Sequence, residues 1–344
     1  MPRGLHLDGP ERLSVQTYEP GPLHADAVRI HVEFAAIKHG TLFHMYSGRS
    51  PFAGKRFDAK SRLFVEDPSK PACSPGFTGN MVVGVVDALG ANVAGVKPGD
   101  RVFGYGTCCE TADLREWWPL GALDPRDAVC TDPGAYALVG ILDGNVLFGE
   151  SVIVFGMGAI GLMAIQFLKA NGVHTIAAID PVPDRQALAK KFGASTVLDP
   201  LQAGLDLGLT SRELTGGDGF DVAIECSGRV DALAHSIRTA RMCGRIVSVG
   251  FYEGPGTPLH LGAEWIHNRL EMICPMPEWG NPMRQHPRWT LKRLRDTVVE
   301  ALRRGQVTGK EICGPVTSLD DAPAQIHAVY KDSRLGLKCC VRFP

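Results

Sequence analysis

The sequence has no hydrophobic run long enough to cross a membrane as a helix. Its longest apolar stretches, at residues 151–155 and 160–168, are interrupted by glycines, whereas a bilayer-spanning helix needs about 20 apolar residues. The first residues, MPRGLHLDGPERL, also lack the apolar core of a secretory signal peptide. We therefore expect a cytoplasmic protein without a membrane partner.

The sequence also lacks an excess of charge of either sign. It contains 36 Lys and Arg against 37 Asp and Glu, which gives a formal net charge of −1. A protein that binds nucleic acid usually carries a basic field, because neutralised phosphates supply much of the affinity. The composition therefore predicts a small-molecule substrate and no nucleic-acid partner.

Closely spaced cysteines are missing as well. The ten cysteines include no C-x-x-C pair, the spacing that is typical of structural zinc sites. The two adjacent pairs, at 108–109 and 339–340, are poor disulfide partners. We interpret the cysteines as small buried hydrophobic residues.

The sequence does contain two stretches that differ in their predicted secondary structure. Before about residue 132, β-branched residues, Gly and Pro predominate, and strands are predicted at 28–34, 81–89 and 100–103. Later, short apolar runs alternate with helical stretches, beginning with a strand at 151–155 and a helix at 160–171. This alternation predicts a parallel sheet with helices on both faces. The polar segment between Gly48 and Pro75 shows no periodicity and is interpreted as a long surface loop.

The strongest local motif follows the strand at 151–155. Gly156, Gly158 and Gly161 form a G-x-G-x-x-G sequence that opens a helix. In a dinucleotide-binding unit the first glycine permits a tight turn, the second lets backbone amides approach a pyrophosphate, and the third allows close helix packing. The free N–H groups of the first helical turn, at Ala159 and Ile160, then face the anion.

An acidic residue stands at the position that binds the ribose of a dinucleotide. Asp180 lies nineteen residues after Gly161, directly past a predicted strand at 175–179. Its carboxylate can accept hydrogen bonds from ribose hydroxyls and repels a 2′-phosphate, so we predict NAD(H) rather than NADP(H). Arg185 can flank the adenosine, or neutralise a 2′-phosphate. The purely structural alternative is that Asp180 caps the turn that follows it.

Further motifs match one superfamily over nearly the whole chain. They are Gly9-Pro10, AAIKHGTLFHMYSG at 35–48, GVVDALG at 84–90, VKPGDRV at 96–102, the glycine motif, FDVAIECSG at 220–228 and GRIVSVG at 244–250. In this order and spacing the chain resembles the medium-chain dehydrogenase/reductase superfamily. The resemblance implies an α/β protein with a GroES-like β-rich catalytic domain (1–131), a doubly wound Rossmann domain (132–277) and a C-terminal segment (278–344) that returns to the catalytic domain.

The resemblance also implies further cofactor contacts. In the superfamily a basic residue five positions before a near-terminal Phe meets the pyrophosphate, and Lys338 before Phe343 fits this pattern. The loops after Glu225 and Val249 flank the cofactor in such proteins. These loops place four more residues at the cofactor: Cys226, Gly228, Gly250 and Phe251.

At the superfamily's metal position this chain has unsuitable residues. Zinc-dependent relatives bind a catalytic zinc through a Cys, a His in Gly-His-Glu, and a later Cys or acid. The corresponding residues here are His39, Asn80, Met81 and Asp132. Zinc prefers thiolate, imidazole or carboxylate ligands, so we expect no catalytic zinc and a likeness to a zinc-independent branch. The alternative is a metal held by His39, Asp132 and a third ligand.

Without zinc, side chains must handle the proton, and the candidates cluster at residues 38–44. In the superfamily the positions of Thr41 and His44 commonly form a relay from substrate to solvent. His39 would stand where the first metal ligand was, suited to general acid/base catalysis near neutral pH. Lys38 is a second option if burial lowers its pKa. Our hypothesis is that His39 and Thr41 share the proton transfer; the alternative is a packed His39 and a solvated Lys38.

The predicted activity is NAD(H)-dependent interconversion of a secondary alcohol, sugar- or polyol-like, and its ketone. Asn80, Asp132 and Glu278 are candidates to line a hydroxyl-rich pocket, and Trp279 would stack on a sugar face. Other readings are reduction of an activated C=C bond of enone or quinone type, a redox-neutral reaction that uses bound NAD transiently, and a non-catalytic NAD-binding protein. In many relatives the strand corresponding to residues 270–274 pairs across a dimer axis, so a homodimer or homotetramer is expected.

Overall fold

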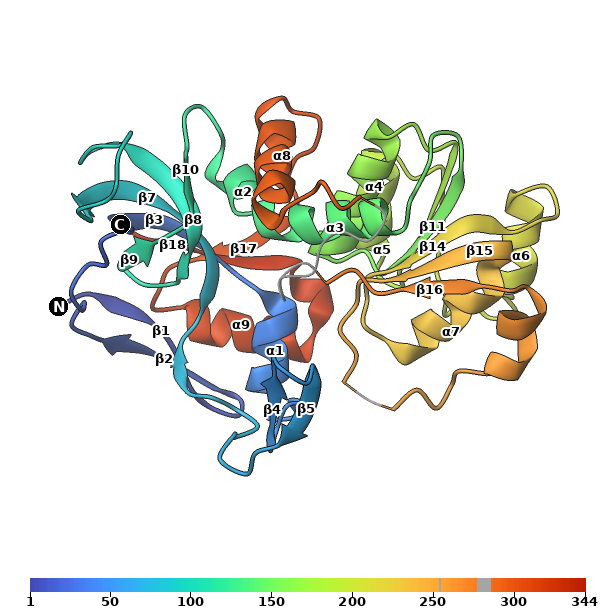
Figure 1. The fold of residues 1–344 in the computed structure, drawn as a ribbon, viewed down its shortest axis with the longest axis horizontal. Coiled ribbons are helices and arrows are strands. Elements are labelled where there is room, and N and C mark those ends of the chain that lie inside the picture. The colour runs from blue at the N-terminus through green and yellow to red at the C-terminus, as the bar shows by residue number, and fades with distance from the viewer. Residues whose placement is uncertain (254, 277–285) are drawn as a thin grey trace. The chain divides into compact units, whose positions relative to one another are not determined.

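The chain folds into two compact units (Figure 1). The computed structural model describes residues 1–253, 255–276 and 286–344. We call Met1–Val129 with Ile312–Pro344 the β-rich unit, and Cys130–Glu311 the Rossmann unit. The Rossmann unit therefore extends past the expected boundary at residue 277, because α8 (Leu291–Arg303) packs against α3 (Thr131–Asp143).

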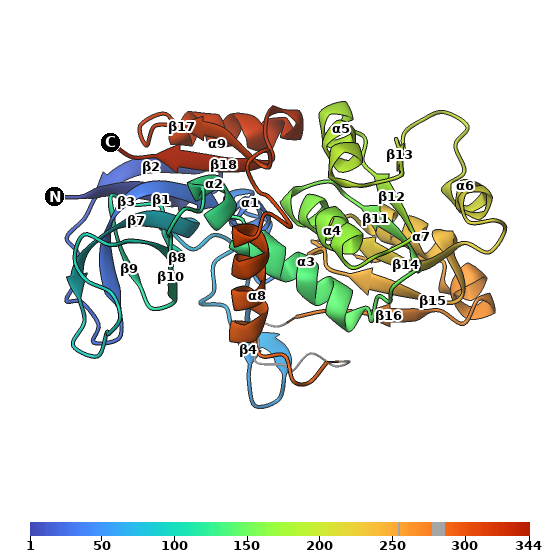
Figure 2. The same cartoon turned by 90° about the horizontal axis from the view of Figure 1, so that it is seen from above.

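The β-rich unit is built around a mixed seven-stranded sheet. Its elements are β1 (Arg3–Gly9), β2 (Arg12–Thr17), β3 (Val28–Ile37), α1 (His39–Tyr46), β4 (Lys55–Asp58), β5 (Leu63–Glu66), β6 (Gly76–Phe77), β7 (Gly79–Leu89), β8 (Arg101–Thr107), β9 (Thr111–Leu114), β10 (Trp117–Pro119), α2 (Pro125–Ala128), β17 (Cys313–Thr317), α9 (Ala322–Lys331), a 3₁₀ turn (Ser333–Leu335) and β18 (Lys338–Arg342). The strand order is β10-β8-β7-β3-β18-β17, and β9 also pairs with β3. Figure 2 shows β17, β18 and α9 together in this unit. The C-terminal residues thus supply two strands of a sheet begun near the N-terminus.

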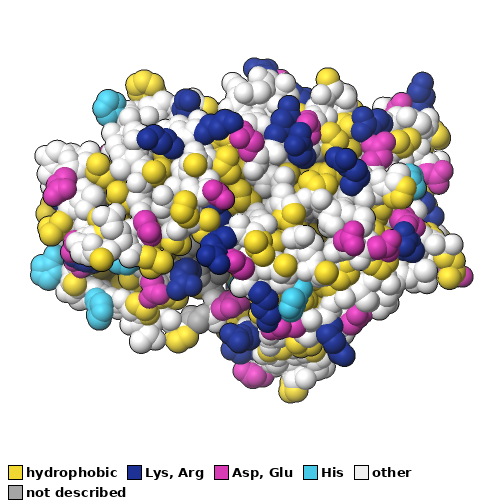
Figure 3. Space-filling model, turned by 180° about the vertical axis from the view of Figure 1, so that it is seen from behind, with side chains coloured by type: hydrophobic (Ala, Val, Ile, Leu, Met, Phe, Trp, Pro, Cys, Tyr) yellow, Lys and Arg dark blue, Asp and Glu magenta, His cyan; other side chains and the backbone are white. Residues whose placement is uncertain are grey.

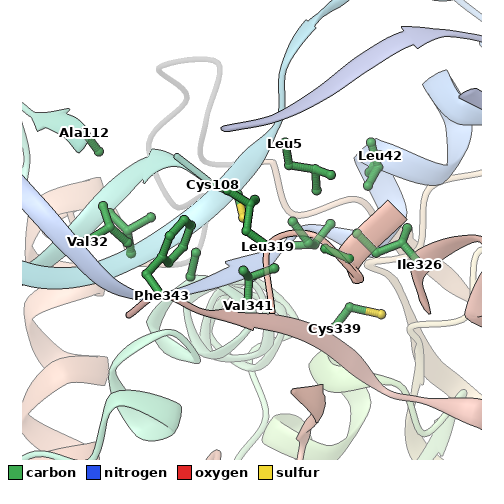
Figure 4. Close-up of a cluster of buried hydrophobic side chains, with 14 of the residues drawn as sticks. Leu5, Val32, Leu42, Cys108, Ala112, Leu319, Ile326, Cys339, Val341 and Phe343 are labelled. Carbon is green, nitrogen blue, oxygen red and sulfur yellow. The ribbon is translucent and has the colours of Figure 1, made fainter. Parts of the chain in front are cut away.

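The core of the β-rich unit joins residues that are distant in the sequence (Figure 4). Val28, Ile30 and Val32 are buried and alternate with more exposed neighbours along β3, as the two-residue period of a strand requires. Leu5 of β1 and Val341 of β18 belong to the same cluster. Since burial of each such side chain contributes about 1.5–3 kcal/mol, the last strand is an integral part of this core.

The predicted surface loop between Gly48 and Pro75 contains a hairpin. Its strands β4 and β5 pair antiparallel with Phe57 opposite Phe64, and the ring of Phe52 stacks on Phe64 with centroids 5.0 Å apart. Most side chains of both strands are exposed or half-exposed. The surface position is therefore as expected, whereas aromatic pairing across the strands adds structure that the sequence pattern did not predict.

The Rossmann unit contains a six-stranded parallel sheet. Its elements after α3 are β11 (Ser151–Phe155), α4 (Ala159–Ala170), β12 (Thr175–Ile179), α5 (Pro183–Phe192), β13 (Thr196–Leu198), α6 (Leu207–Leu214), β14 (Phe220–Glu225), α7 (Val230–Thr239), β15 (Ala240–Ser248), a π-helical turn (Leu261–Trp265), β16 (Glu271–Ile273) and α8. The strand order is β13-β12-β11-β14-β15-β16. This is the 3-2-1-4-5-6 order of dinucleotide-binding folds, so the predicted fold class is confirmed.

The order of the strands reverses between β11 and β14, which are neighbours in the middle of the sheet. Figure 1 shows α4 above these strands and α7 below them. In open sheets of this kind a ligand binds beyond the carboxyl ends of the strands at the point of reversal. The strands predicted at 151–155 and 175–179 are confirmed as β11 and β12.

Charges of both signs lie on the face drawn in Figure 3, where Lys and Arg side chains are interspersed with Asp and Glu. In the part of the chain that the structure describes, no helix is both long and apolar enough to span a bilayer.

Candidate functional site

The loop between β11 and α4 needs each glycine of its motif for a different reason. Gly156 has a φ of +88°, and a Cβ there would lie 2.7 Å from the Cβ of Ser227. A Cβ at Gly161 would overlap the carbonyl oxygen of Gly156. At Gly158 a Cβ would meet no atom within 4 Å. Two glycines therefore shape the loop, while the third leaves space beside it.

The space at Gly158 adjoins the N-terminus of α4. Gly158 is the N-cap of α4 and provides no side-chain hydrogen bond to the first turn. The N–H groups at the start of a helix have no partner within the helix, and they carry the positive end of its dipole. The N–H groups of Ala159 and Ile160 lie in this first turn. The loop can therefore hold a pyrophosphate.

Asp180 is anchored directly behind this loop. Its side chain is 4% exposed, Oδ2 accepts a hydrogen bond of 2.8 Å from the Met157 N–H, and Oδ1 accepts one of 2.9 Å from the Val182 N–H. The bond to Val182 is the turn cap that we considered as an alternative, and the bond to Met157 links β12 to the glycine loop. Because each carboxylate oxygen has two lone pairs, ribose hydroxyls can still bind. Arg185 lies nearby, with Nη1 3.9 Å from Oδ2.

A buried carboxylate that the sequence analysis missed organises the next two loops. Glu225, the last residue of β14, is fully buried and accepts hydrogen bonds from the Ser227 N–H (2.6 Å), the Gly228 N–H (3.1 Å) and the Tyr252 hydroxyl (2.6 Å). The Ser227 hydroxyl is a further donor. Burial raises the pKa of Glu225. The sequence did contain a signal for Glu225, because an acidic residue ends the apolar run in FDVAIE.

The loops after β14 and β15 touch each other around this carboxylate. A Cβ at Gly250 would overlap Oε2 of Glu225 and the N–H nitrogen of Gly228, and a Cβ at Gly228 would overlap the Phe251 carbonyl oxygen. Cys226 continues the sheet, because its N–H bonds the Phe155 carbonyl at 2.8 Å. The four loop residues named from the resemblance therefore lie together at the carboxyl end of the sheet.

In the β-rich unit the proton-transfer candidates lie on α1, a helix that the sequence analysis did not predict. His39 is its first residue. Its Nε2 lies 2.9 Å from the backbone nitrogen of Cys339 and accepts that N–H, and its ring stacks on Phe43 with centroids 4.9 Å apart. A ring nitrogen that accepts an N–H carries no proton, so the hydrogen-bond network assigns the proton of the neutral ring to Nδ1.

The two relay candidates are three residues apart on α1 and therefore share one side of the helix. Thr41 is exposed, and His44 is half-buried. Burial lowers the pKa of His44, which favours its neutral form, the form that can take up a proton. Lys38 immediately precedes α1 and is half-buried.

Two residues that were predicted for different roles are hydrogen-bonded to each other. Lys338, expected at the cofactor's pyrophosphate, is only 3% exposed. Its Nζ donates to Oδ1 of Asn80 (3.3 Å), a candidate substrate residue, and to the carbonyl of Ile37 (3.2 Å). Lys338 begins β18 and Asn80 lies near the start of β7. The structure thus places a buried ammonium group beside residues at the family's metal position.

Two residues at this position have a candidate ligand atom engaged by another group of the protein. The lone pair of His39 Nε2 is used by a backbone N–H, and the side-chain oxygen of Asn80 is used by an ammonium. Among the residues that the structure describes, no group of three or more His, Cys, Asp or Glu could hold a metal.

Of the remaining substrate candidates, the structure describes Asp132. Asp132 is buried in the first turn of α3 and belongs to the Rossmann unit. Trp279 and Glu278 lie outside the described residues. Asn80 is a substrate candidate that is hydrogen-bonded to another predicted site residue, Lys338.

Two family models match the chain, one in each part of it. The alcohol dehydrogenase GroES-like domain matches residues 24–139, and the zinc-binding dehydrogenase matches residues 159–272. A relative from Escherichia coli (strain K12), D-guloside 3-dehydrogenase, is 34% identical over 335 residues and covers 93% of each chain.

Solved structures share the fold at lower identity. The 2R,3R-butanediol dehydrogenase of Bacillus subtilis has a TM-score of 0.81 at 20% identity and covers 100% of both chains. An alcohol dehydrogenase of Escherichia coli CFT073, solved in complex with NADH, has a TM-score of 0.78 at 19% identity and covers 99% of both chains. At these identities the likeness concerns the fold alone.

Proposed function

The chain belongs to the alcohol dehydrogenase family of medium-chain dehydrogenases/reductases, and on this premise we propose that it interconverts a sugar-like secondary alcohol and its ketone with NAD(H) and without catalytic zinc. The observation that carries this proposal is the pairing of two features. One is an open helix N-terminus backed by a fixed Asp180. The other is an ammonium group, that of Lys338, bonded to a residue of the metal position.

The preference for NAD(H) is supported by the surroundings of Asp180. Its carboxylate is held at the end of β12 by two backbone N–H groups, so it cannot swing away from a ligand without losing both bonds. A 2′-phosphate next to this fixed negative charge would be repelled. Arg185 is already near the same carboxylate, which reduces its capacity to neutralise a phosphate.

The substrate class is supported by the relatives and by the polar residues of the β-rich unit. The relative that matches 93% of the chain is named for oxidation of a guloside at position 3. We propose a secondary ring hydroxyl of a glycoside or related polyol as the reacting group. The side chains of Asn80, Thr41 and His39 can donate hydrogen bonds to such hydroxyls.

The residues of α1 then handle the proton. Bound NAD⁺ supplies the hydride acceptor, while the chain must remove the hydroxyl proton as the carbonyl forms. We assign that proton to the Thr41 hydroxyl and from there to His44, whose neutral form is favoured by burial. The N–H bond to Nε2 favours His39 as a hydrogen-bond donor through Nδ1 rather than as the base. This assignment modifies our hypothesis that His39 and Thr41 share the proton transfer.

The proposal is tested with purified protein, a panel of methyl hexopyranosides and polyols, and both cofactors. We expect reduction of NAD⁺, with a kcat/KM for NAD⁺ at least about tenfold above that for NADP⁺. Metal analysis of the same sample should give far less than one zinc per chain, and a chelator should not change kcat. Thr41→Val should lower kcat by about 100-fold, whereas Thr17→Val, a change at the exposed end of β2, should leave it unchanged.

Two results would contradict the proposal. A stoichiometric metal whose removal abolishes activity and whose return restores it would overturn the zinc-free chemistry. Tight NAD(H) binding without turnover of any alcohol or ketone in the panel would favour a non-catalytic NAD-binding protein instead. We also propose association into a homodimer or homotetramer through the sheet edge at β16, which light scattering can measure.

A further inference from the structure

Lys338 is a buried charge whose described partners are all neutral. Its side chain is 3% exposed, and its two hydrogen bonds end on an amide oxygen and a backbone carbonyl oxygen. No carboxylate forms an ion pair with Lys338 within the described ranges of the chain. Lysine is almost never fully buried without a partner of opposite charge, because desolvation of an ammonium costs several kcal/mol. A ligand with a negative or partly negative oxygen would supply the missing partner.

The sheet fixes where this charge lies. Ile37 and Asn80 are paired across β3 and β7, and Lys338 reaches both from β18. The next residue, Cys339, donates its N–H to His39. The ammonium group is therefore bonded to Asn80, at the second metal-ligand position, and the residue after Lys338 bonds His39, at the first.

We propose that the Lys338 ammonium is the fixed cation of the active site and binds the reacting oxygen of the substrate. An ammonium has three N–H donors, and two of them point to the oxygens of Ile37 and Asn80. The third donates to the substrate hydroxyl. This inference rests on the proposed function, because it assigns to a side chain the charge stabilisation that a metal provides in zinc-dependent relatives.

The chemistry balances without a change in the charge of Lys338. During oxidation the substrate O–H bond breaks, and its proton passes to Thr41 and then His44. The carbon–hydrogen bond breaks with its electron pair, which leaves as hydride to bound NAD⁺, and the carbon–oxygen double bond forms. Negative charge develops on the oxygen in between, and a preorganised cation in a site of low dielectric stabilises it. Lys338 keeps its protons throughout.

The test is Lys338→Met in the full-length enzyme, with the best substrate from the panel. Met is apolar and similar in length to Lys, and its introduction leaves no partner charge unpaired, so we expect the variant to fold. We expect kcat to fall by about 10²–10³-fold, the NADH dissociation constant to change less than threefold, and a deuterium isotope effect on kcat at least as large as that of the natural chain. The control is Lys97→Met, a change at an exposed lysine of the same unit.

Three outcomes would overturn the inference. The first is a kcat within threefold of the natural chain. The second is a large loss of NADH affinity with kcat kept at saturating cofactor, which would assign Lys338 to the pyrophosphate. The third is a lower kcat without an isotope effect, which would indicate a slow step other than hydride transfer. If the Met variant does not fold, Lys338→Arg is measured by the same criteria, because its planar cation cannot reproduce the ammonium geometry.

Failure of this inference can be distinguished from failure of the proposed function. The natural chain is assayed first for alcohol oxidation and for bound metal. If it is inactive, or if it needs a metal, the proposed function fails before any variant is made. If it is active and metal-free but Lys338→Met retains its kcat, only the role of Lys338 is wrong.

Discussion

The two units hold the buried charges of their candidate site residues with partners at very different distances along the chain. In the Rossmann unit, Asp180 is held by the N–H groups of Met157 and Val182, which are 23 and 2 residues away. In the β-rich unit, Lys338 bonds Ile37 and Asn80, which are 301 and 258 residues away. The contacts of Asp180 are local, and a short motif can encode them. The contacts of Lys338 exist only after the whole sheet has formed.

The two units also differ in the kind of group that they present to a ligand. The Rossmann half presents backbone N–H groups at the start of α4, with glycines that leave room for a ligand. The β-rich half presents side chains, and its neutral partners leave the charge of Lys338 uncompensated. Under the proposed function, recognition of the cofactor would depend on backbone geometry, whereas the reaction would depend on individual side chains.

The largest expected effect comes from the glycine loop. In Gly161→Val the new side chain overlaps the Gly156 carbonyl, so we expect destabilisation by about 3 kcal/mol or more and no measurable NADH binding. Gly158→Ala meets no atom and should leave the melting temperature almost unchanged, while it weakens NADH binding about tenfold because the methyl group stands where the pyrophosphate approaches. Thermal unfolding and NADH fluorescence titration measure both effects.

A matched control for these variants is Gly262→Ala, also in the Rossmann unit and also in open space. It should change neither stability nor NADH affinity. If Gly158→Ala binds NADH as tightly as Gly262→Ala does, the open space at Gly158 is not the pyrophosphate site, and the proposed cofactor geometry is wrong.

An intermediate effect is expected from Asp180. Asp180→Ala removes the acceptor of two buried N–H groups, so it should cost about 1–3 kcal/mol of stability and lower the preference for NAD⁺ over NADP⁺ about tenfold or more. The ratio of the two kcat/KM values measures the preference. Asp184→Asn, which removes a nearby exposed carboxylate, should keep the ratio. An unchanged ratio in Asp180→Ala would mean that this carboxylate only caps its turn.

The smallest expected effects concern the pH dependence of stability, and they have opposite signs in the two units. Burial lowers the pKa of His44 below its usual 6.5. The unfolded chain then binds the proton more readily, so this residue lowers stability as pH falls below about 6.5. Burial raises the pKa of Glu225 above 4.5, so its contribution is fully present below pH 4.5 and is lost as pH rises through the folded pKa.

Denaturant unfolding between pH 4 and pH 8 measures these contributions. His44→Gln should remove part of the loss of stability on the acid side. Glu225→Gln should remove the opposite trend, on top of a constant loss from its altered hydrogen bonds. The control is His24→Gln, a change at an exposed histidine. If His44→Gln and His24→Gln give the same pH profile, burial of His44 has no consequence for stability.

Much of the Rossmann unit was predictable because its signals are local. The strand 151–155, the three glycines and Asp180 lie within thirty residues of one another, and their roles depend on backbone geometry that any sequence with this spacing must adopt. Glu225 was missed although it is equally local, because a carboxylate at the end of an apolar strand does not by itself indicate which donors surround it.

In the β-rich unit the residues were found but their arrangement was not. His39, Thr41 and His44 were named from a resemblance, yet their helix was not predicted, because eight residues are too few for a clear helical period. The hairpin at β4 and β5 depends on the pairing of Phe57 with Phe64, and no alternation in the sequence signals that contact.

By itself the sequence determined the fold class, the glycine loop and the acidic residue beside it, since these depend on short spacings along the chain. Only the tertiary structure decided that Lys338 is buried against Asn80 and Ile37, and that the Nε2 lone pair of His39 is used by a backbone N–H. Those contacts join the first strands of the sheet to the last one, and their register is set by strand pairing and core packing rather than by any local preference.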